Sequence, residues 1–168
     1  MLYFWRRSRD YVEDNLEGGR SRENPERGCK EMTADLSLLA RGARREFRIT
    51  AGLRAGYTAD GVLFDVGQAV AIVERWVAER QRRALPTLSG MMTRGEIIYA
   101  KDGVAQREPV AIFSGEIPPL EPEPSDPEIE AALDELGARL AEGLLQEEIS
   151  IAYRGEVWIM RRGEAVVS

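Results

Sequence analysis

The spacing of apolar residues changes several times along the chain, and each change predicts a new element. Residues 46–54 alternate apolar and polar side chains, which is the pattern of a strand buried on one face. Residues 66–84 carry apolar side chains at helical spacing instead. Asp65 and Gln68 form a capping-box pair at the start of this segment, and Pro86 ends it. The first half of the chain is therefore predicted to contain a strand followed by an amphipathic helix.

A hairpin is predicted on either side of a second helix. The segment 95–113 places β-forming residues on both sides of Asp102-Gly103, a strong signal for a two-residue turn. Pro109 interrupts the returning half and indicates a bulge or an edge position. A second hairpin is predicted over 149–160, where apolar and polar residues alternate again.

The second amphipathic helix is predicted over 127–145. Its leucines recur at helical spacing, and acidic residues fill its first turns, where the positive end of the helix dipole favours them. Asp126 is the expected N-cap, and Pro127 suits the first helical position because that position needs no N–H donor. The segment 117–126 before it is rich in proline, so we expect an extended connector.

The resulting order is strand, helix, hairpin, helix, strand, with one more strand at the end. This order predicts an α+β fold of the ferredoxin-like type (βαββαβ, a split β-α-β), in which two helices cover one face of an antiparallel sheet. We expect a single α+β domain over residues 46–168. Residues 1–45 are predicted to be an N-terminal arm, partly disordered or forming a short helix, because much of the arm offers little to bury.

The other face of such a sheet needs water or a partner. Several predicted strands carry apolar residues on both faces, as with Ile98 beside Tyr99 and Trp158 beside Ile159. Exposed apolar surface of this kind usually marks an interface. We therefore predict a homo-oligomer or a protein partner.

Composition restricts the chemistry of the chain. Histidine is absent and Cys29 is the only cysteine, so histidine-based catalysis and internal disulfides are excluded. We expect no metal and no cofactor. Residues 118–168 hold twelve acidic and four basic side chains, which repel a phosphate backbone. No apolar run reaches the ~20 residues of a membrane span. We expect a cytoplasmic protein that binds neither nucleic acid nor membrane.

Candidate ligand-binding residues are of two kinds. Polar side chains that can orient a ligand lie at expected strand ends and loops, and large aromatic side chains can line a pocket. The segment 52–56 follows a strand and carries glycines with an arginine, but it lacks the strand–loop–helix order of anion-binding loops, so we interpret it as a connection. The candidates are Arg54, Tyr57, Trp76, Arg94, Tyr99, Tyr153 and Trp158.

No recognisable catalytic motif accompanies these candidates. The sequence has no nucleotide-binding loop, no metal cluster and no carboxylate pair in a familiar context. We therefore predict a non-catalytic protein-binding or regulatory module that works within an assembly. The alternative is a small cofactor-independent enzyme or ligand-binding protein with an aromatic pocket, in which Arg54 or Arg94 clamps an anion.

Overall fold

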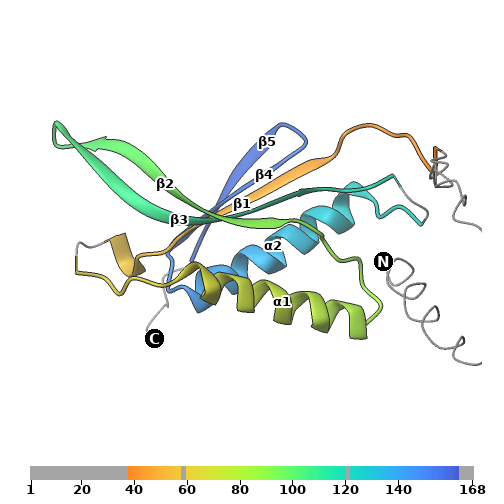
Figure 1. Ribbon diagram of the computed structural model, residues 1–168, viewed down its shortest axis with the longest axis horizontal. Helices are drawn as coiled ribbons and strands as arrows, with labels where there is room; N and C mark the ends of the chain where they lie inside the picture. The colour runs from red at the N-terminus through yellow and green to blue at the C-terminus, as the bar shows by residue number, and fades with distance from the viewer. Residues whose placement is uncertain (1–37, 58–59, 120–121, 163–168) are drawn as a thin grey trace, which may run out of the picture. The chain divides into compact units, whose positions relative to one another are not determined.

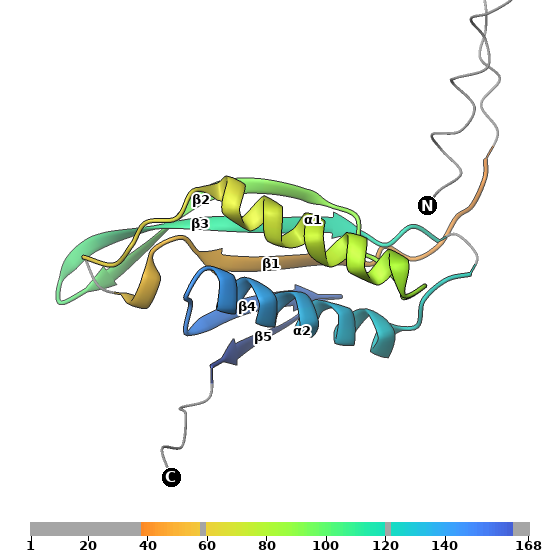
Figure 2. The same ribbon diagram turned by 90° about the horizontal axis from the view of Figure 1, so that it is seen from below.

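The computed structural model describes residues 38–57, 60–119 and 122–162, which fold around a five-stranded antiparallel sheet (Figure 1). Two helices lie on one face of that sheet, side by side along the strands (Figure 2). The elements in chain order are β1 (Glu46–Gly52), the 3-10 helix η1 (Ala55–Tyr57), α1 (Val66–Arg82), β2 (Met91–Lys101), β3 (Val104–Glu116), α2 (Asp126–Gly143), β4 (Glu148–Tyr153) and β5 (Glu156–Arg161).

The strand order β2-β3-β1-β4-β5 confirms the predicted ferredoxin-like α+β fold. In the split β-α-β plan the hairpin strand β3 lies between β1 and β2, so every neighbouring pair is antiparallel. The additional strand β5 extends the sheet beyond β4 as its second edge. The central strand is therefore β1, and its side chains reach the middle of both sheet faces.

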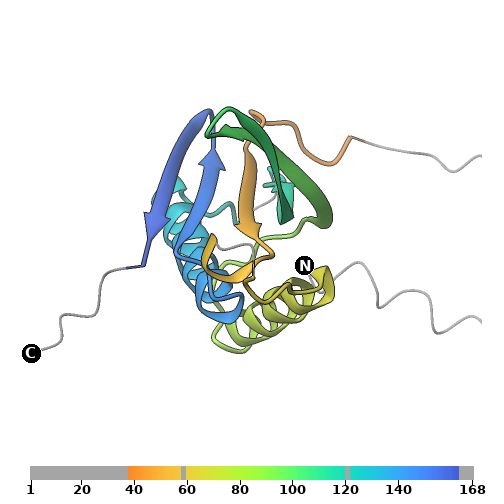
Figure 3. The same ribbon diagram turned by 90° about the vertical axis from the view of Figure 1, so that its left-hand side faces the viewer.

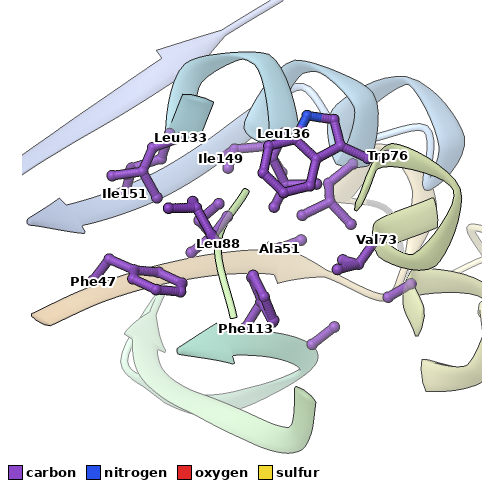
Figure 4. Packing of buried hydrophobic residues seen from close by; sticks show 14 of the residues in the cluster. Phe47, Ala51, Val73, Trp76, Leu88, Phe113, Leu133, Leu136, Ile149 and Ile151 are labelled. Atoms are coloured by element: carbon purple, nitrogen blue, oxygen red, sulfur yellow. The ribbon is translucent and has the colours of Figure 1, made fainter. Parts of the chain in front are cut away.

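The core lies between the helices and one face of the sheet. Alternation along β1 directs Phe47, Ile49 and Ala51 to this side, and all three are buried. Trp76 on α1 and Leu136 on α2 pack against the same cluster (Figure 4). The helices are held to the sheet by burial of this shared apolar surface, which is the main stabilising contribution in such folds.

The two helix starts differ in how well they follow the prediction. At α1, Asp65 accepts a hydrogen bond from Gly67 N–H, and Gln68 Oε1 accepts one from Asp65 N–H, which confirms the capping box. At α2 the N-cap is Ser125 and not Asp126, because Glu128 accepts hydrogen bonds from both the backbone N–H and the hydroxyl of Ser125. Asp126 is thereby left available for contacts away from the helix end.

Pro109 lies within β3 without ending it. The Pro109 carbonyl accepts a hydrogen bond from Leu53 N–H at 2.8 Å, so the Pro109 nitrogen faces that same side. Pairing between β1 and β3 stops at Gly52 with Val110, and the Leu53 carbonyl, which Pro109 cannot serve as a donor, accepts from Phe64 N–H at 2.7 Å instead. The β2 side continues unbroken, because Glu96 pairs with Pro109. The residue thus occupies a local edge of an otherwise internal strand.

The segment before β1 has no helix between residues 38 and 45, and the remainder of the predicted arm, residues 1–37, lies outside the described residues. None of the helices that the structure describes is long and apolar enough to cross a membrane.

The sheet face opposite the helices is covered by no helix or strand among the described residues (Figure 3). We call it the open face. The strand register places several exposed apolar side chains there: Met91, Ile97, Tyr99, Val104, Val157 and Ile159. Self-association through this face stays a prediction. We expect light scattering of the full-length protein to give a mass above that of one chain, whereas a monomer at all concentrations would contradict it.

Candidate functional site

The sequence-predicted site residues do not converge on one pocket. Trp76 is fully buried in the core, where Arg80 lies over its ring at 5.3 Å from the centroid. Trp158 faces α2, and its indole N–H donates to Asp134 at 2.9 Å. Tyr153 also points to the helix side and is buried. Strand alternation explains the last two positions, because both residues share a face with buried isoleucines of β4.

The remaining predicted residues are spread over the sheet and its loops. Tyr99 lies on the open face of β2, whereas Arg94 on the same strand has the opposite orientation and is exposed. Tyr57 ends η1. Arg54 follows β1, and its guanidinium donates to the Gly61 carbonyl at 3.3 Å. Of the seven residues, Tyr153 and Arg54 take part in the two polar clusters described next.

Tyr153 belongs to a polar cluster that we call the clasp, made of Arg45, Glu123, Asp126, Tyr153 and Arg154, in which Arg45 and Tyr153 are buried and the other three are partly exposed. The Arg45 guanidinium donates to Tyr153 Oη at 2.9 Å and to Asp126 Oδ1 at 2.7 Å, and it also pairs with Glu123. Tyr153 donates its hydroxyl hydrogen to Asp126 at 2.7 Å. The clasp joins the segment before β1, the proline-rich connector and the ends of α2 and β4. Because its donors and acceptors pair with one another, we interpret the clasp as a structural cluster that holds these segments together.

The charge states of the clasp follow from these bonds. The hydrogen bond from Tyr153, followed by the charges of Arg154 and Arg45, lowers the pKa of Asp126 below its usual value. Burial raises the pKa of Tyr153, and the hydrogen bond to Asp126 acts in the same direction. The clasp therefore holds an ionised aspartate beside a neutral tyrosine at neutral pH.

A second polar cluster lies on the open face at the end of β1, and sequence reasoning missed it. Gly52 has no side chain there, and a Cβ in its place would overlap both Gln146 Oε1 and Glu108 Oε1. Gln146 comes from the segment after α2 and Glu108 from β3. The glycine thus makes room for two oxygen atoms that approach the same point from different elements. A glycine inside a strand pattern is the one sequence signal for such a close approach.

The amide group of Gln146 has a fixed orientation that leaves its oxygen buried without a hydrogen bond, which is energetically unfavourable. Its side chain is buried, with 1% of its surface exposed. The amide nitrogen donates to the carbonyls of Arg54, at 3.0 Å, and Leu144, at 2.8 Å, which settles the orientation of the amide. Oε1 is left buried with no hydrogen-bond partner among the described residues. A buried acceptor without a donor is destabilising, and in native proteins it often marks a functional position.

Glu108 supplies a second acceptor to the same place. Burial raises the pKa of its carboxyl group, while the positive charge of Arg54 opposes that rise. A carboxylate beside a partnerless amide oxygen concentrates negative potential over Gly52. Glu108 and Gln146, which meet beside Gly52 and which we call the acceptor pole, therefore favour a cation or a hydrogen-bond donor.

A groove of about 840 Å³ occupies the other end of the open face. Arg48 on β1 lies in it, with Ser114 and Ala152 opposite on the neighbouring strands. These small neighbours leave the guanidinium in a wide hollow. Arg44 is paired with Glu46 and Glu116 at the rim. Arg48 and the acceptor pole together form the candidate site.

Metal ligation has no support within residues 38–57, 60–119 and 122–162, where no three acidic or cysteine side chains come together. The candidate site instead offers one cationic and one anionic end on a single sheet face.

The chain matches no family model and no curated protein. Among solved structures it is similar to a phage SAM lyase in complex with S-methyl-5'-thioadenosine, at 22% identity and a TM-score of 0.53. The apo state of a phage SAM lyase matches at 21% identity and the same TM-score. Each match covers 75% of this chain and 97% of the other. At this identity the likeness establishes a shared fold.

The prediction of a non-catalytic binding or regulatory module is contradicted by these comparisons. Both matched chains are enzymes, and the fold covers almost their whole length. The alternative prediction, a small enzyme or ligand-binding protein, agrees better with the comparisons. The sequence did not indicate an enzyme, because it has no nucleotide-binding loop, metal cluster or familiar carboxylate pair.

Proposed function

We propose that this protein is an enzyme that cleaves S-adenosylmethionine at a carbon–sulfur bond and releases S-methyl-5'-thioadenosine. The observation that carries the proposal is the acceptor pole, where Glu108 and the buried, partnerless Oε1 of Gln146 approach the same point beside Gly52. S-adenosylmethionine is a sulfonium cation with an ammonium group, and both require such surroundings. The fold shared with the phage SAM lyase supports the same assignment.

The chemistry of this substrate fits a chain without histidine. A sulfonium sulfur carries a permanent positive charge, so the C–S bond breaks when its electron pair moves onto sulfur. The departing thioether is then neutral and needs no proton. The four-carbon fragment balances the change by bonding to its own nucleophilic group or by losing a proton to a base. Neither route needs a histidine general acid.

Glu108 and Gln146 have distinct roles in this proposal. Gln146 presents a fixed partial negative charge, since its amide nitrogen is tied to two backbone carbonyls. In the free protein the carboxylate form of Glu108 is destabilised, because burial disfavours its charge and raises its pKa. A bound cation offsets that penalty and favours ionisation. The site is thereby prepared for a positively charged ligand before the ligand arrives.

The proposal is tested by incubating the full-length protein with S-adenosylmethionine and following the products by mass spectrometry. We expect S-methyl-5'-thioadenosine to accumulate with protein concentration and time. S-adenosylhomocysteine is the matched control, because it has the same skeleton with a neutral thioether and should stay intact. Undiminished S-adenosylmethionine, together with no binding heat in calorimetry, would contradict the proposal.

A further inference from the structure

We infer that Arg48 binds the carboxylate of the substrate's amino-acid end and so determines which sulfonium compounds the site accepts. This inference rests on the proposed function and deepens it. Its basis is the position and pairing of one arginine on the open face.

Arg48 differs from the other arginines around the groove. Arg44 is paired with Glu46 and Glu116, and Arg154 is paired with Asp126. Arg48 has no ion-pair or hydrogen-bond partner among the residues that the structure describes. It nevertheless lies on the central strand of the sheet, in a groove whose lining combines small residues such as Ser114 and Ala152 with glutamates such as Glu156.

The side chains next to Arg48 on the neighbouring strands are small, so they leave room for a ligand group beside its guanidinium. The residues that pair with it across the sheet are Ser114 and Ala152. Met91 and Val157, which are largely exposed, stand at the two sides of the groove. A planar guanidinium in such a setting can bind a carboxylate with two parallel hydrogen bonds.

Charge matching selects the carboxylate among the parts of S-adenosylmethionine. The molecule has one anionic group, its carboxylate, while the sulfonium and ammonium groups are cationic and the nucleoside is neutral. The candidate site has one unpaired cation among its described residues, Arg48, and an acceptor pole around Glu108 and Gln146. Placing the carboxylate at Arg48 and the cationic groups toward the acceptor pole matches the charges of these two ends.

The separation of the two ends is consistent with a single ligand. Arg48 and Gly52 are four residues apart on β1 and lie on the same face, which corresponds to roughly 13 Å along the strand. The side chains of Arg48 and Glu108 can shorten that span by reaching toward each other. Thr50 lies between the two ends, paired with Ile112 and Ser150, and none of these three side chains is charged.

The experiment compares two ligands, one with and one without the amino-acid end that carries the carboxylate. S-adenosylhomocysteine carries the amino-acid end, whereas S-methyl-5'-thioadenosine has the nucleoside and thioether without it. Binding of both to the wild-type protein, Arg48→Gln, Arg48→Lys and Arg94→Gln is measured by calorimetry. Arg94 is the matched control because it is an exposed arginine on the opposite side of the sheet.

We expect Arg48→Gln to weaken S-adenosylhomocysteine binding roughly 10- to 100-fold, which is typical for loss of a charge-assisted pair, and to leave S-methyl-5'-thioadenosine unchanged. Arg48→Lys should recover part of the loss, and Arg94→Gln should match the wild type. An equal loss for both ligands, or none for either, would overturn the role of Arg48. If the wild-type protein binds neither ligand and also leaves S-adenosylmethionine intact, the proposed function fails; if it binds neither ligand but cleaves S-adenosylmethionine, the role of Arg48 alone is overturned.

Discussion

Replacing Glu108 with glutamine is expected to reduce cleavage of S-adenosylmethionine at least about 100-fold, the usual loss when a group that stabilises charge at a reacting centre is removed. The substitution keeps the size of the side chain and removes only its ability to carry a negative charge. Gln146 Oε1 remains in place but cannot balance a sulfonium cation alone. Initial rates from the product assay, compared with those of Glu96→Gln on the neighbouring strand, measure the effect.

The same substitution is expected to make the protein slightly more stable at neutral pH. The raised pKa of Glu108 means that its carboxylate costs stability once the pH exceeds the ordinary value for glutamate, and that this cost vanishes below it. Glutamine removes the cost, and its amide can donate to the partnerless Oε1 of Gln146. We expect a rise in the melting temperature of roughly 2 °C, small because Glu108 is only partly buried.

The pH dependence provides an independent check on Glu108. If the ionised carboxylate binds the cation, wild-type activity should fall as the pH drops through the raised pKa of Glu108. A variant Glu108→Gln that keeps full activity, or that loses activity together with stability, would contradict the assigned role.

Among the substitutions that we predict, Arg45→Ala is expected to lower the stability of the folded protein most. Arg45 is 8% exposed and donates to Tyr153, Asp126 and the carbonyl of Pro124 at 2.7–2.9 Å. Its removal leaves these acceptors without their buried cation, which costs about 3 kcal/mol in comparable cases. We expect the melting temperature in thermal unfolding to fall by roughly 10 °C.

Acid should reduce the difference in stability between Arg45→Ala and the wild type, while the part due to the hydrogen bonds of Arg45 to Pro124 and Tyr153 remains. The pKa of Asp126 is lowered in the folded protein, so its contribution to stability is complete above the ordinary aspartate value and is lost as the pH falls through the lowered one. Unfolding measured at pH 7 and near pH 3 tests this. Tyr153→Phe is the control that removes one hydroxyl, and it should cost about 1 kcal/mol. A difference that is as large near pH 3 as at pH 7 would contradict an ionic contribution to the effect.

The predicted and observed elements agree most closely where interactions between residues near in sequence determine the structure. The capping box at Asp65 and Gln68 is formed as predicted, and so are both helices and both hairpins. The start of α2 shows that this agreement does not extend to the choice between two neighbouring N-cap residues. Ser125 and Asp126 are both good N-caps, and the structure uses Ser125 while Asp126 enters the clasp. The contacts of Asp126 with distant Arg45 and Tyr153 are not visible in the local sequence.

The candidate site depends even more on contacts between residues that are distant in sequence. Gly52, Glu108 and Gln146 are separated by more than thirty residues at each step, and no motif links them. Their meeting depends on the register that pairs Gly52 with Val110, which places Glu108 on the same face two residues away. A shift of one residue would move Glu108 to the other side of the sheet.

By itself the sequence determined the kinds of element, their order and hence the α+β fold, because periodicity and capping act over a few residues. Only the tertiary structure decided that Trp76 and Tyr153 lie in the interior, that Arg48 stands in a groove, and that Gln146 Oε1 faces Glu108 without a donor. Strand register and loop paths depend on contacts across the whole chain. Chemistry that arises from such contacts therefore leaves little trace in any short stretch of sequence.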